Sequence, residues 1–457
     1  MDNVKINEKD NVCVSLETGH KTSLCDIEAG ADIIKYGYPI GVATQDIKKG
    51  ESVHSHNMKT KLGDILSYEY TPDFSYPEEK EPFYIDAFVR ENGDIGIRND
   101  IWIVPTVGCV NSIGKILAEK TGAVYFSHPY GCSQLGDDMK ITQLILKGLI
   151  KHPNAGGVLV LGLGCENNNI PEMKKILGIV NEKRIRFLSV QDCEDEIEKG
   201  IEIINELKLI ASEDKRQSVP VSRLKIGLKC GGSDGFSGIT ANAVVGMLTD
   251  EICAMGSTAV LTEVPEMFGA EKVLFERCEN KEVFEKGVSL INNFKQYFKD
   301  HGQPVSENPS PGNKEGGITT LEEKSLGCVQ KGGSAVITDI LDYGDTLTKT
   351  GLNLLNGPGN DIVSITNLAA AGCHMILFTT GRGTPLGGAV PTVKIASNDI
   401  IAEKKAHWID FSAFGADKKQ KADELLELIK QTANGRQTKN EILGNREIAI
   451  FKDGVTL

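Results

Sequence analysis

The sequence predicts an α/β protein whose sheets are largely parallel, preceded by a small β-rich module. From Phe83 onward, short apolar runs alternate with longer segments of helical character, which is the pattern of repeated βαβ units. Several of the apolar runs are followed directly by polar, glycine-rich loops. Because ligands bind at the carboxyl ends of strands in an open α/β sheet, these loops also predict a small-molecule site.

The chain of 457 residues is long enough for two or three domains, and its composition suggests where they divide. Residues 1–70 alternate short apolar runs with turns, so we expect the β-rich module there. Residues 71–82 contain three prolines and a run of charge, which favours an extended linker. Two Rossmann-like α/β regions are expected at 83–215 and 216–457, because a polar stretch ending in proline separates them.

The elements of each region follow from the alternation of apolar runs. In the first region we predict strands at 101–105, 123–126, 157–162 and 185–190, and helices at 112–120, 140–151, 171–177 and 194–209. In the second we predict strands at 224–228, 258–262, 334–338, 375–379 and 392–396, and a helix at 243–255. Apolar residues at helical spacing over 419–435 predict an amphipathic C-terminal helix.

Charge and hydropathy narrow the class of partner. The net charge of −13 argues against nucleic acid, which needs a concentrated basic surface. The sequence has neither an apolar run of membrane-spanning length nor a signal-peptide core, so we expect a cytoplasmic protein with no membrane partner. We expect a small-molecule partner and leave homo-oligomerisation open. An anionic substrate would need a local cluster of cations, for which the candidates are Lys21, Lys35, Arg98, Lys229, Arg382 and Lys394.

Three loops have the composition of a binding site. Lys229–Asn242 combines four glycines with five short polar side chains, and glycines let a backbone approach a ligand closely. Asn308–Gly317 and Thr379–Gly388 have the same character. Arg382 lies between two glycines, where its guanidinium has room to bind a carboxylate with two parallel hydrogen bonds. A solvated turn that caps the next helix is the alternative reading of the first loop.

These loops resemble the altronate/galactarate dehydratase family, and the likeness runs from about residue 10 to about residue 415. It is also carried by Gly96–Asn99, His128–Cys132 and Gly162–Glu166. The N-terminal stretch resembles the small SAF (β-clip) domain of this family, at Gly19–Lys21, Ile34–Gly41 and Val53–Asn57. The resemblance implies elimination of water from a sugar acid to give a 2-keto-3-deoxy acid, with the help of a divalent metal.

We assign roles to individual residues as hypotheses. Lys229 and Arg382 are expected to hold the substrate carboxylate, and short polar side chains to bind its hydroxyl groups. The predicted substrate-binding set is Arg98, Lys229, Ser233, Asp234, Asn242, Asn313, Arg382 and Thr384. The general base and acid are sought among His128, His20 and Lys21.

The metal hypothesis concerns His54 and His56. If Val53–Asn57 is a strand, both imidazoles face the same side and can ligate one ion, with Asn57 orienting one ring. Imidazole and oxygen ligands would suit Fe(II) or Mn(II). A pair of surface histidines without a metal is the alternative.

The eleven cysteines include no Cys-x-x-Cys pair, and disulfides are not expected in the cytosol. Those near glycines or in loops are Cys109, Cys132, Cys165, Cys230 and Cys373. We favour buried small hydrophobes for them over an iron–sulfur cluster. The glycines of 157–166 do not make a dinucleotide site, because Glu166 would repel phosphates; it is a capping residue or a site carboxylate.

Several functions fit these observations. A dehydratase acting on D-altronate to give 2-keto-3-deoxy-gluconate is preferred, because the His-x-His-Asn stretch resembles the altronate-type members. A galactarate dehydratase, or another 2-hydroxy-acid lyase of the same architecture such as one for sulfolactate, is the alternative within the family. A non-catalytic sugar-acid-binding protein is the alternative outside it.

Overall fold

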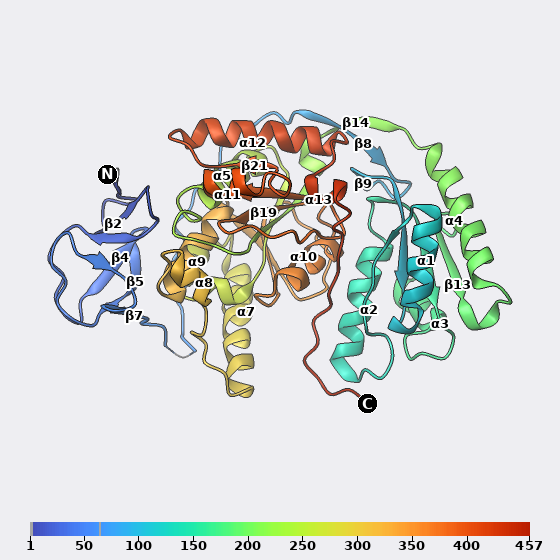
Figure 1. The fold of residues 1–457 in the computed structure, drawn as a ribbon, viewed down its shortest axis with the longest axis horizontal. Helices are drawn as coiled ribbons and strands as arrows, with labels where there is room; N and C mark the ends of the chain where they lie inside the picture. Colours follow the sequence, from blue (N-terminus) through green and yellow to red (C-terminus); the bar gives the residue numbers. More distant parts are fainter. Residues whose placement is uncertain (1–2, 64) are drawn as a thin grey trace.

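The computed structural model describes residues 3–63 and 65–457, and it has the α/β architecture that the sequence predicts. Figure 1 shows a small β module at the N-terminal end, a large central α/β region and a smaller α/β region on its other side. Among the described residues, no helix is both long and apolar enough to cross a bilayer.

The N-terminal module consists of two small antiparallel sheets, whose strands lie between Asn3 and Lys59. The first contains, in spatial order, β1 (Asn3–Val4), β2 (Val12–Ser15), β3 (Lys21–Ser23) and β6 (Ser52–Val53). The second contains β4 (Asp32–Lys35), β5 (Tyr38–Ala43) and β7 (Met58–Lys59). Inward-facing side chains such as Val14, Ile33 and Ile40 are fully buried and form its core.

The smaller α/β region is built on a parallel four-stranded sheet. Its strands, in spatial order, are β11 (Val124–Tyr125), β10 (Asp100–Pro105), β12 (Ala155–Gly162) and β13 (Ile185–Ser189). Its helices are α1 (Asn111–Thr121), α2 (Gly136–Ile150), α3 (Ile170–Leu177) and α4 (Glu196–Ser212). The 3-10 turn η1 (Gly108–Val110) precedes α1, and η2 (Val190–Asp192) lies between β13 and α4. Helices α1 and α4 pack against each other, and α2 packs with α3, so the apolar strands are covered on both faces.

The polar stretch that was expected to be a boundary is partly a strand. Within 212–220, residues Arg216–Pro220 form β14, which pairs antiparallel with β8 (Tyr84–Val89). Strand β8 in turn pairs with β9 (Ile95–Gly96). The sequence gives little sign of this strand because Gln217 and Ser218, which point to opposite faces, are both exposed, and only Val219 is buried.

The central region contains a parallel sheet of seven strands. In spatial order they are β17 (Ile337–Leu341), β18 (Gly351–Leu355), β16 (Thr258–Leu261), β15 (Lys225–Cys230), β19 (Met375–Thr380), β20 (Thr392–Ala396) and β21 (Phe411–Ser412). The chain leaves β15 toward β16 and later returns to its other side as β19. The topological switch point, where ligands bind in such sheets, therefore lies between β15 and β19.

Helices cover both faces of this sheet. They are α5 (Ala241–Ala254), α6 (Glu271–Phe275), α7 (Lys281–Asp300), α8 (Pro311–Glu315), α9 (Leu321–Cys328), α10 (Asp361–Ala370), α11 (Asp399–Lys404), α12 (Lys418–Ala433) and α13 (Lys439–Ile442), with 3-10 turns η3 (Val221–Arg223), η4 (Val264–Met267) and η5 (Val329–Gly332). Helix α12, the amphipathic helix predicted near the C-terminus, packs on α5. Helix α10 packs on α2 and joins the two α/β regions (Figure 1).

Candidate active site

The candidate active site lies at the switch point of the seven-stranded sheet. The loop after β15 and the loop after β19 meet there, because the backbone N–H groups of Gly381 and Arg382 both donate to Gly232 O at 3.1 Å. A Cβ atom on Gly231 would lie 2.7 Å from Asp361 Oδ2 and 2.8 Å from Phe378. Glycine is required at this position because two side chains converge on its Cα.

A buried lysine organises the charges beneath these loops. Lys229, near the end of β15, is fully buried, and its Nζ pairs with Glu263 and with Asp361 Oδ1 at 2.7 Å. Burial alone would lower the pKa of Lys229, but the charges of Glu263 and Asp361 raise it. Glu263 has φ +70°, a strained conformation for a residue with a side chain. The side chain of Asp361 is 39% exposed, so it reaches from the buried cluster to the crevice.

A second lysine lies in the same cluster without a hydrogen-bond partner. Lys394 Nζ stands 3.4 Å from the centre of the Phe378 ring and makes no hydrogen bond. Burial lowers the pKa of Lys394 to about 7, against the attraction of Asp361. An amine that is partly neutral at pH 7 can accept a proton, which an ordinary lysine cannot.

One group of residues in the described part of the chain has the donors for a divalent ion. Cys230, Glu266 and Cys328 are buried, with ligand atoms within 4.8 Å of one another. Cationic side chains neutralise this group in the structure, since Lys331 Nζ lies 2.8 Å from Cys230 Sγ and Lys324 Nζ lies 2.9 Å from Glu266 Oε1. Two thiols and a carboxylate are a donor set that divalent transition metals accept, so the residues fit such an ion.

The two thiols of this group are close enough to influence each other. Cys230 Sγ and Cys328 Sγ lie 3.3 Å apart. The hydrogen bond from Cys328 lowers the pKa of Cys230 to about 6, although burial raises it, and the charge of Lys331 also favours the thiolate. The same contact raises the pKa of Cys328. One thiolate and one thiol are therefore expected at neutral pH.

Arg382 lies at the mouth of the crevice. Its guanidinium donates to Gly312 O at 3.1 Å and pairs with Glu315 Oε2 at 3.0 Å. Both partners belong to α8, and the side chains of Arg382 and Glu315 are 48% and 74% exposed. Such an exposed pair exchanges readily, so the guanidinium is available to an incoming carboxylate.

The polar side chains predicted in the loops hold these loops in place. Asp234 accepts hydrogen bonds from Ser237, Ser397 and Asn398, which fastens the loop after β15 to the end of β20. Asn242 donates to Gly327 O and accepts from Thr379. Asp234 and Asn242 therefore hold the loops around the crevice in place. Other protein groups already occupy most of their hydrogen-bond donors and acceptors.

The remaining predicted loop residues are arranged in the same way. Asn313 Nδ2 donates to Ser233 O at 2.7 Å, and Asn313 also completes the capping box of Ser310 at the start of α8. Ser233 itself is buried. Thr384 is half-buried beyond Arg382 and accepts a hydrogen bond from Leu386 N at 3.3 Å.

The N-terminal module docks directly on this site. Lys21 Nζ binds Gly317 O, Thr319 Oγ1 and Glu323 Oε2, each at 2.8 to 2.9 Å, and Lys35 Nζ binds Glu323 Oε1 at 2.8 Å. All three charged side chains are buried. Burial would raise the pKa of Glu323, but the charges of Lys21 and Lys35 lower it to about 2. Burial lowers the pKa of Lys21 to about 8.

The interface between module and crevice leaves a small polar cavity. Its volume of about 10 Å³ is that of a single water, and Lys35, Asp234, Asn242 and Lys324 are among the lining residues. The module thus closes over the loop after β15 in this structure. A sugar acid would need a larger space than this cavity.

The histidine pair does not have the predicted geometry. His54–Asn57 forms a turn after β6 rather than a strand, because Asn57 Oδ1 accepts from His54 N and Asn57 Nδ2 donates to Ser52 O. The ring of His54 contacts Lys314 O through Nε2 and Ser55 Oγ through Nδ1, and His56 is exposed. The ring of His20 lies 5.6 Å from that of His54.

Two predicted site residues lie on other parts of the molecule. His128 follows β11 in the smaller region; its Nε2 contacts Pro105 O at 2.8 Å, its Nδ1 accepts from Tyr130 N, and burial lowers its pKa. Arg98 pairs with Glu441 of α13 and donates to backbone carbonyls near the end of α12. His128 therefore fixes the loop after β11, and Arg98 ties its own segment to α13 and the end of α12.

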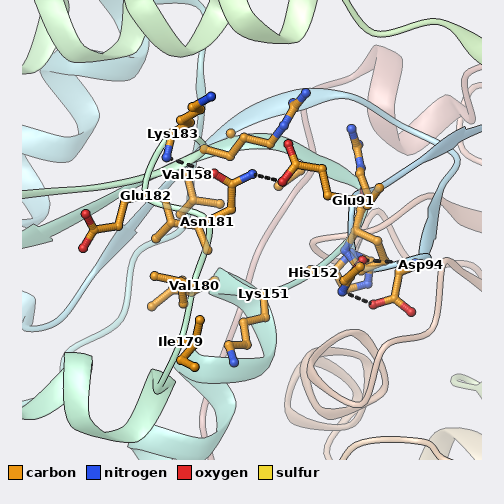
Figure 2. A pocket seen from close by; sticks show the side chains of 18 residues that line it. Glu91, Asp94, Lys151, His152, Val158, Ile179, Val180, Asn181, Glu182 and Lys183 are labelled. Atoms are coloured by element: carbon orange, nitrogen blue, oxygen red, sulfur yellow. Dashed lines mark hydrogen bonds between the residues drawn. The ribbon is translucent and has the colours of Figure 1, made fainter.

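A large cavity elsewhere does not have the features of a catalytic site. It measures about 860 Å³ and lies at the amino-terminal ends of β12 and β13. Figure 2 shows side chains of both charges around it, with Asn181 donating to Glu91 at 2.8 Å. Ligands bind at the opposite, carboxyl edge of such sheets.

Comparisons with known proteins agree with the resemblance. Residues 15–61 match the altronate/galactarate dehydratase SAF domain, residues 87–212 the D-galactarate dehydratase/altronate hydrolase second domain, and residues 221–456 the D-galactarate/altronate dehydratase C-terminal domain. The chain is 53% identical to an altronate dehydratase of Escherichia coli over 98% of its own length and 94% of the relative.

Two further relatives show the range of the family. An altronate dehydratase of Bacillus subtilis is 53% identical, over 99% of this chain and 94% of the relative. A galactarate dehydratase (L-threo-forming) of Escherichia coli is 31% identical, over 90% of this chain and 83% of the relative. The predicted family is therefore confirmed: the chain belongs to the altronate/galactarate dehydratase family.

Proposed function

We propose that this protein is a hydro-lyase that removes water from D-altronate to give 2-keto-3-deoxy-gluconate. The observation that carries the proposal is the buried Lys394, which makes no hydrogen bond and lies in one cluster with Lys229 and Asp361 at the switch point of the large sheet. Altronate is preferred over galactarate because the two relatives named altronate dehydratase are 53% identical, against 31% for the galactarate enzyme.

The first task of the site is to hold the substrate carboxylate, which we assign to Arg382. The exposed guanidinium exchanges Glu315 for the substrate and keeps the planar, two-bond geometry that a carboxylate offers. Lys229 does not take this role directly, because two carboxylates already neutralise it. It holds Asp361 at the crevice, where the exposed carboxylate can accept hydrogen bonds from substrate hydroxyls.

The second task is to remove the proton from C2, beside the carboxylate. We assign this to Lys394, because a base must be unprotonated near the working pH, and burial brings the pKa of this amine to about 7. Lys394 Nζ is covered by protein in the structure, so the crevice has to open for it to reach the substrate. Because the cavity beneath the docked module measures only about 10 Å³, we propose that substrate enters when the module lifts.

The third task is to protonate the hydroxyl that leaves C3. His20 is the proposed acid, since it stands at the rim of the module beside His54. The preceding residue, Gly19, packs against Phe236 of the loop after β15, which places His20 next to that loop. Lys21 and His128 are not assigned this role because hydrogen bonds to protein groups occupy them.

A divalent ion, when bound, would act as a Lewis acid that stabilises the negative charge on the substrate carboxylate. Cys230, Glu266 and Cys328 would hold it. Thiolate ligands favour Fe(II) over Mn(II), because manganese prefers oxygen donors. We further propose a cytoplasmic location, for which the expectation from the sequence is the support.

The test is an anaerobic assay of the full chain with D-altronate and galactarate, with and without added Fe(II) or Mn(II), that detects the 2-keto-3-deoxy acid. We expect product from altronate at a kcat/KM at least tenfold above that for galactarate. Product from galactarate alone would reassign the substrate. Tight binding of altronate without product under every metal condition would make this a binding protein and refute the proposal.

A further inference from the structure

Three exposed cysteines lie at the carboxyl edge of the four-stranded sheet, away from the crevice described above. Cys109 follows β10, Cys132 follows β11 and Cys165 follows β12. The expectation that loop cysteines are buried hydrophobes holds for Cys373. Cys230 is buried but contacts Lys331, and the other three are exposed, so the expectation is wrong for them. Exposed thiols on three adjacent strand ends of one parallel sheet need an explanation other than packing.

The loops that carry the thiols are bound to one another. Gly108 N, next to Cys109, donates to Tyr130 O at 2.9 Å. Gly131 O, next to Cys132, accepts from Asn168 N at 3.0 Å in the loop that contains Cys165. A Cβ atom on Gly131 would lie 2.0 Å from Thr106 O, so the first two loops touch at this glycine.

Buried polar side chains fix this arrangement from below. Glu166 accepts from Thr106 Oγ1 at 2.6 Å and from the N–H groups of Leu163 and Gly164, although it is buried. His128 holds the second loop through its two ring nitrogens. Glu166 and His128 are therefore occupied in holding the loops. The exposed thiols of Cys109, Cys132 and Cys165 remain as side chains that could bind a ligand.

Neighbouring side chains direct hydrogen-bond donors at the sulfur atoms. Gln191 Nε2 donates to Cys165 Sγ at 3.6 Å, and Ser133 Oγ approaches Cys132 Sγ at 4.0 Å. Ser133 has φ +58°, so the backbone is strained to place it there. Hydrogen bonds to sulfur are the contacts that stabilise metal-bound thiolates.

We propose that Cys109, Cys132 and Cys165 together hold an iron–sulfur cluster. Sulfur atoms on one tetrahedral ion lie about 3.8 Å apart, given metal–sulfur bonds of about 2.3 Å. In the described chain the three thiols do not belong to any group of ligands within 4.8 Å of one another, so they are spaced too widely for one ion. A cluster of several irons bridged by sulfide spans a wider ring of thiolates.

The number of thiolates has a chemical consequence. Cys193, after β13, is half-buried and packs against the core of this region, so three thiolates are offered. A four-iron cluster takes four cysteines when it only transfers electrons. With three, one iron has no protein ligand and can bind an oxygen of a small molecule as a Lewis acid.

The test is to isolate the full chain anaerobically, reconstitute it with ferrous iron and sulfide, and measure iron, acid-labile sulfide and visible absorption. We expect about four irons and four sulfides per chain. C109S, C132S and C165S should each lower both by at least fivefold. C193S, at the same sheet edge, and C25S, exposed on the N-terminal module, should leave both unchanged.

A second readout does not depend on the variants folding. Reconstitution of the wild-type chain should protect Cys109, Cys132 and Cys165 from alkylation and leave Cys25 reactive. Iron or zinc bound without sulfide would contradict the cluster, as would equal alkylation before and after reconstitution. Because none of these readouts requires turnover, the result stands apart from the proposed dehydratase activity, which the product assay tests.

Discussion

The chemical state of Lys394 depends on the fold. Burial places the pKa of its amine at about 7, whereas an exposed lysine has about 10.5. As the proposed base it must be neutral, so kcat should rise with pH up to about 7 and then level off. Lys394→Met should lower kcat by about 10²–10⁴-fold and remove that pH dependence.

The control for this prediction is Lys225→Met, at the start of β15 and outside the cluster around Lys229. It should keep the rise of kcat with pH. An unchanged kcat and pH profile in Lys394→Met would remove this lysine from the mechanism.

Arg382 is expected to act through its geometry as well as its charge. Arg382→Lys keeps the positive charge but loses the two parallel hydrogen bonds, and one bond to a charged group contributes about 1.5–3 kcal/mol. We therefore expect KM for altronate to rise at least tenfold with a smaller change in kcat. Arg186→Lys, an exposed arginine of similar setting on the smaller region, should leave both constants unchanged. Equal KM values in the two variants would place Arg382 outside the site.

At the scale of elements, the docking of the N-terminal module depends on one carboxylate. Glu323 of α9 binds both Lys21 and Lys35, and the three groups are buried. Glu323→Ala would leave two buried ammonium groups without a negatively charged partner, at a cost of about 3–5 kcal/mol. We expect the module to detach, so that limited proteolysis cuts the segment 71–82 at least tenfold faster.

Asp26→Ala provides the comparison, because its ion pair with Lys48 is exposed and solvent screens it. Its cleavage rate should equal that of the wild type. If Glu323→Ala is cut no faster than Asp26→Ala, the module is held by its apolar contacts instead.

The elements also show which parts of the fold the sequence could predict. Strands such as β12 and β19 were predicted to within about two residues, because fully buried parallel strands are continuous apolar runs between glycines. Strand β18 was missed, since Asn353 interrupts its apolar pattern; in the structure Asn353 is buried and bonds to Lys349 O and Gly351 O. Strand β17 begins at Ile337 rather than Ser334, because the turn before it is fixed by Asp250, remote in sequence.

The sequence predicted the loops of the candidate site better than its individual residues. Glycine-rich composition located the loops around Gly231 and Arg382 correctly at the strand ends. Glu263, Glu266 and Asp361 were missed, because their neighbours in sequence carry no such signal and only the sheet order brings them to Lys229 and Cys230. The strained φ of Glu263 is likewise visible only in three dimensions.

At the scale of the whole molecule, the contact between the two α/β regions is sensitive to acid. His152 Nε2 donates to Cys373 O, 3.1 Å away, while its Nδ1 accepts from Asn154 N, and burial lowers the pKa of His152 to about 4. In the unfolded chain the pKa of His152 is about 6.5. The neutral, buried His152 therefore contributes fully to stability above pH 6.5, and this contribution is lost as the pH falls to about 4. It amounts to about 3 kcal/mol.

We therefore expect the midpoint of urea unfolding to fall between pH 6.5 and 4. His152→Gln, which cannot be protonated, should show a shallower fall over the same range. Parallel pH curves for the wild type and this variant would show that His152 does not control the acid response.

The central claim is that the crevice between β15 and β19 dehydrates a sugar acid. The most direct test measures release of the 2-keto-3-deoxy acid from D-altronate by the wild type, Lys394→Met, Arg382→Lys and the control Arg186→Lys under one anaerobic, metal-supplemented condition. We predict product from the wild type and the control, at least a hundredfold lower kcat for Lys394→Met, and a raised KM for Arg382→Lys. Wild-type rates in both crevice variants would contradict the claim and move the chemistry to another part of the molecule.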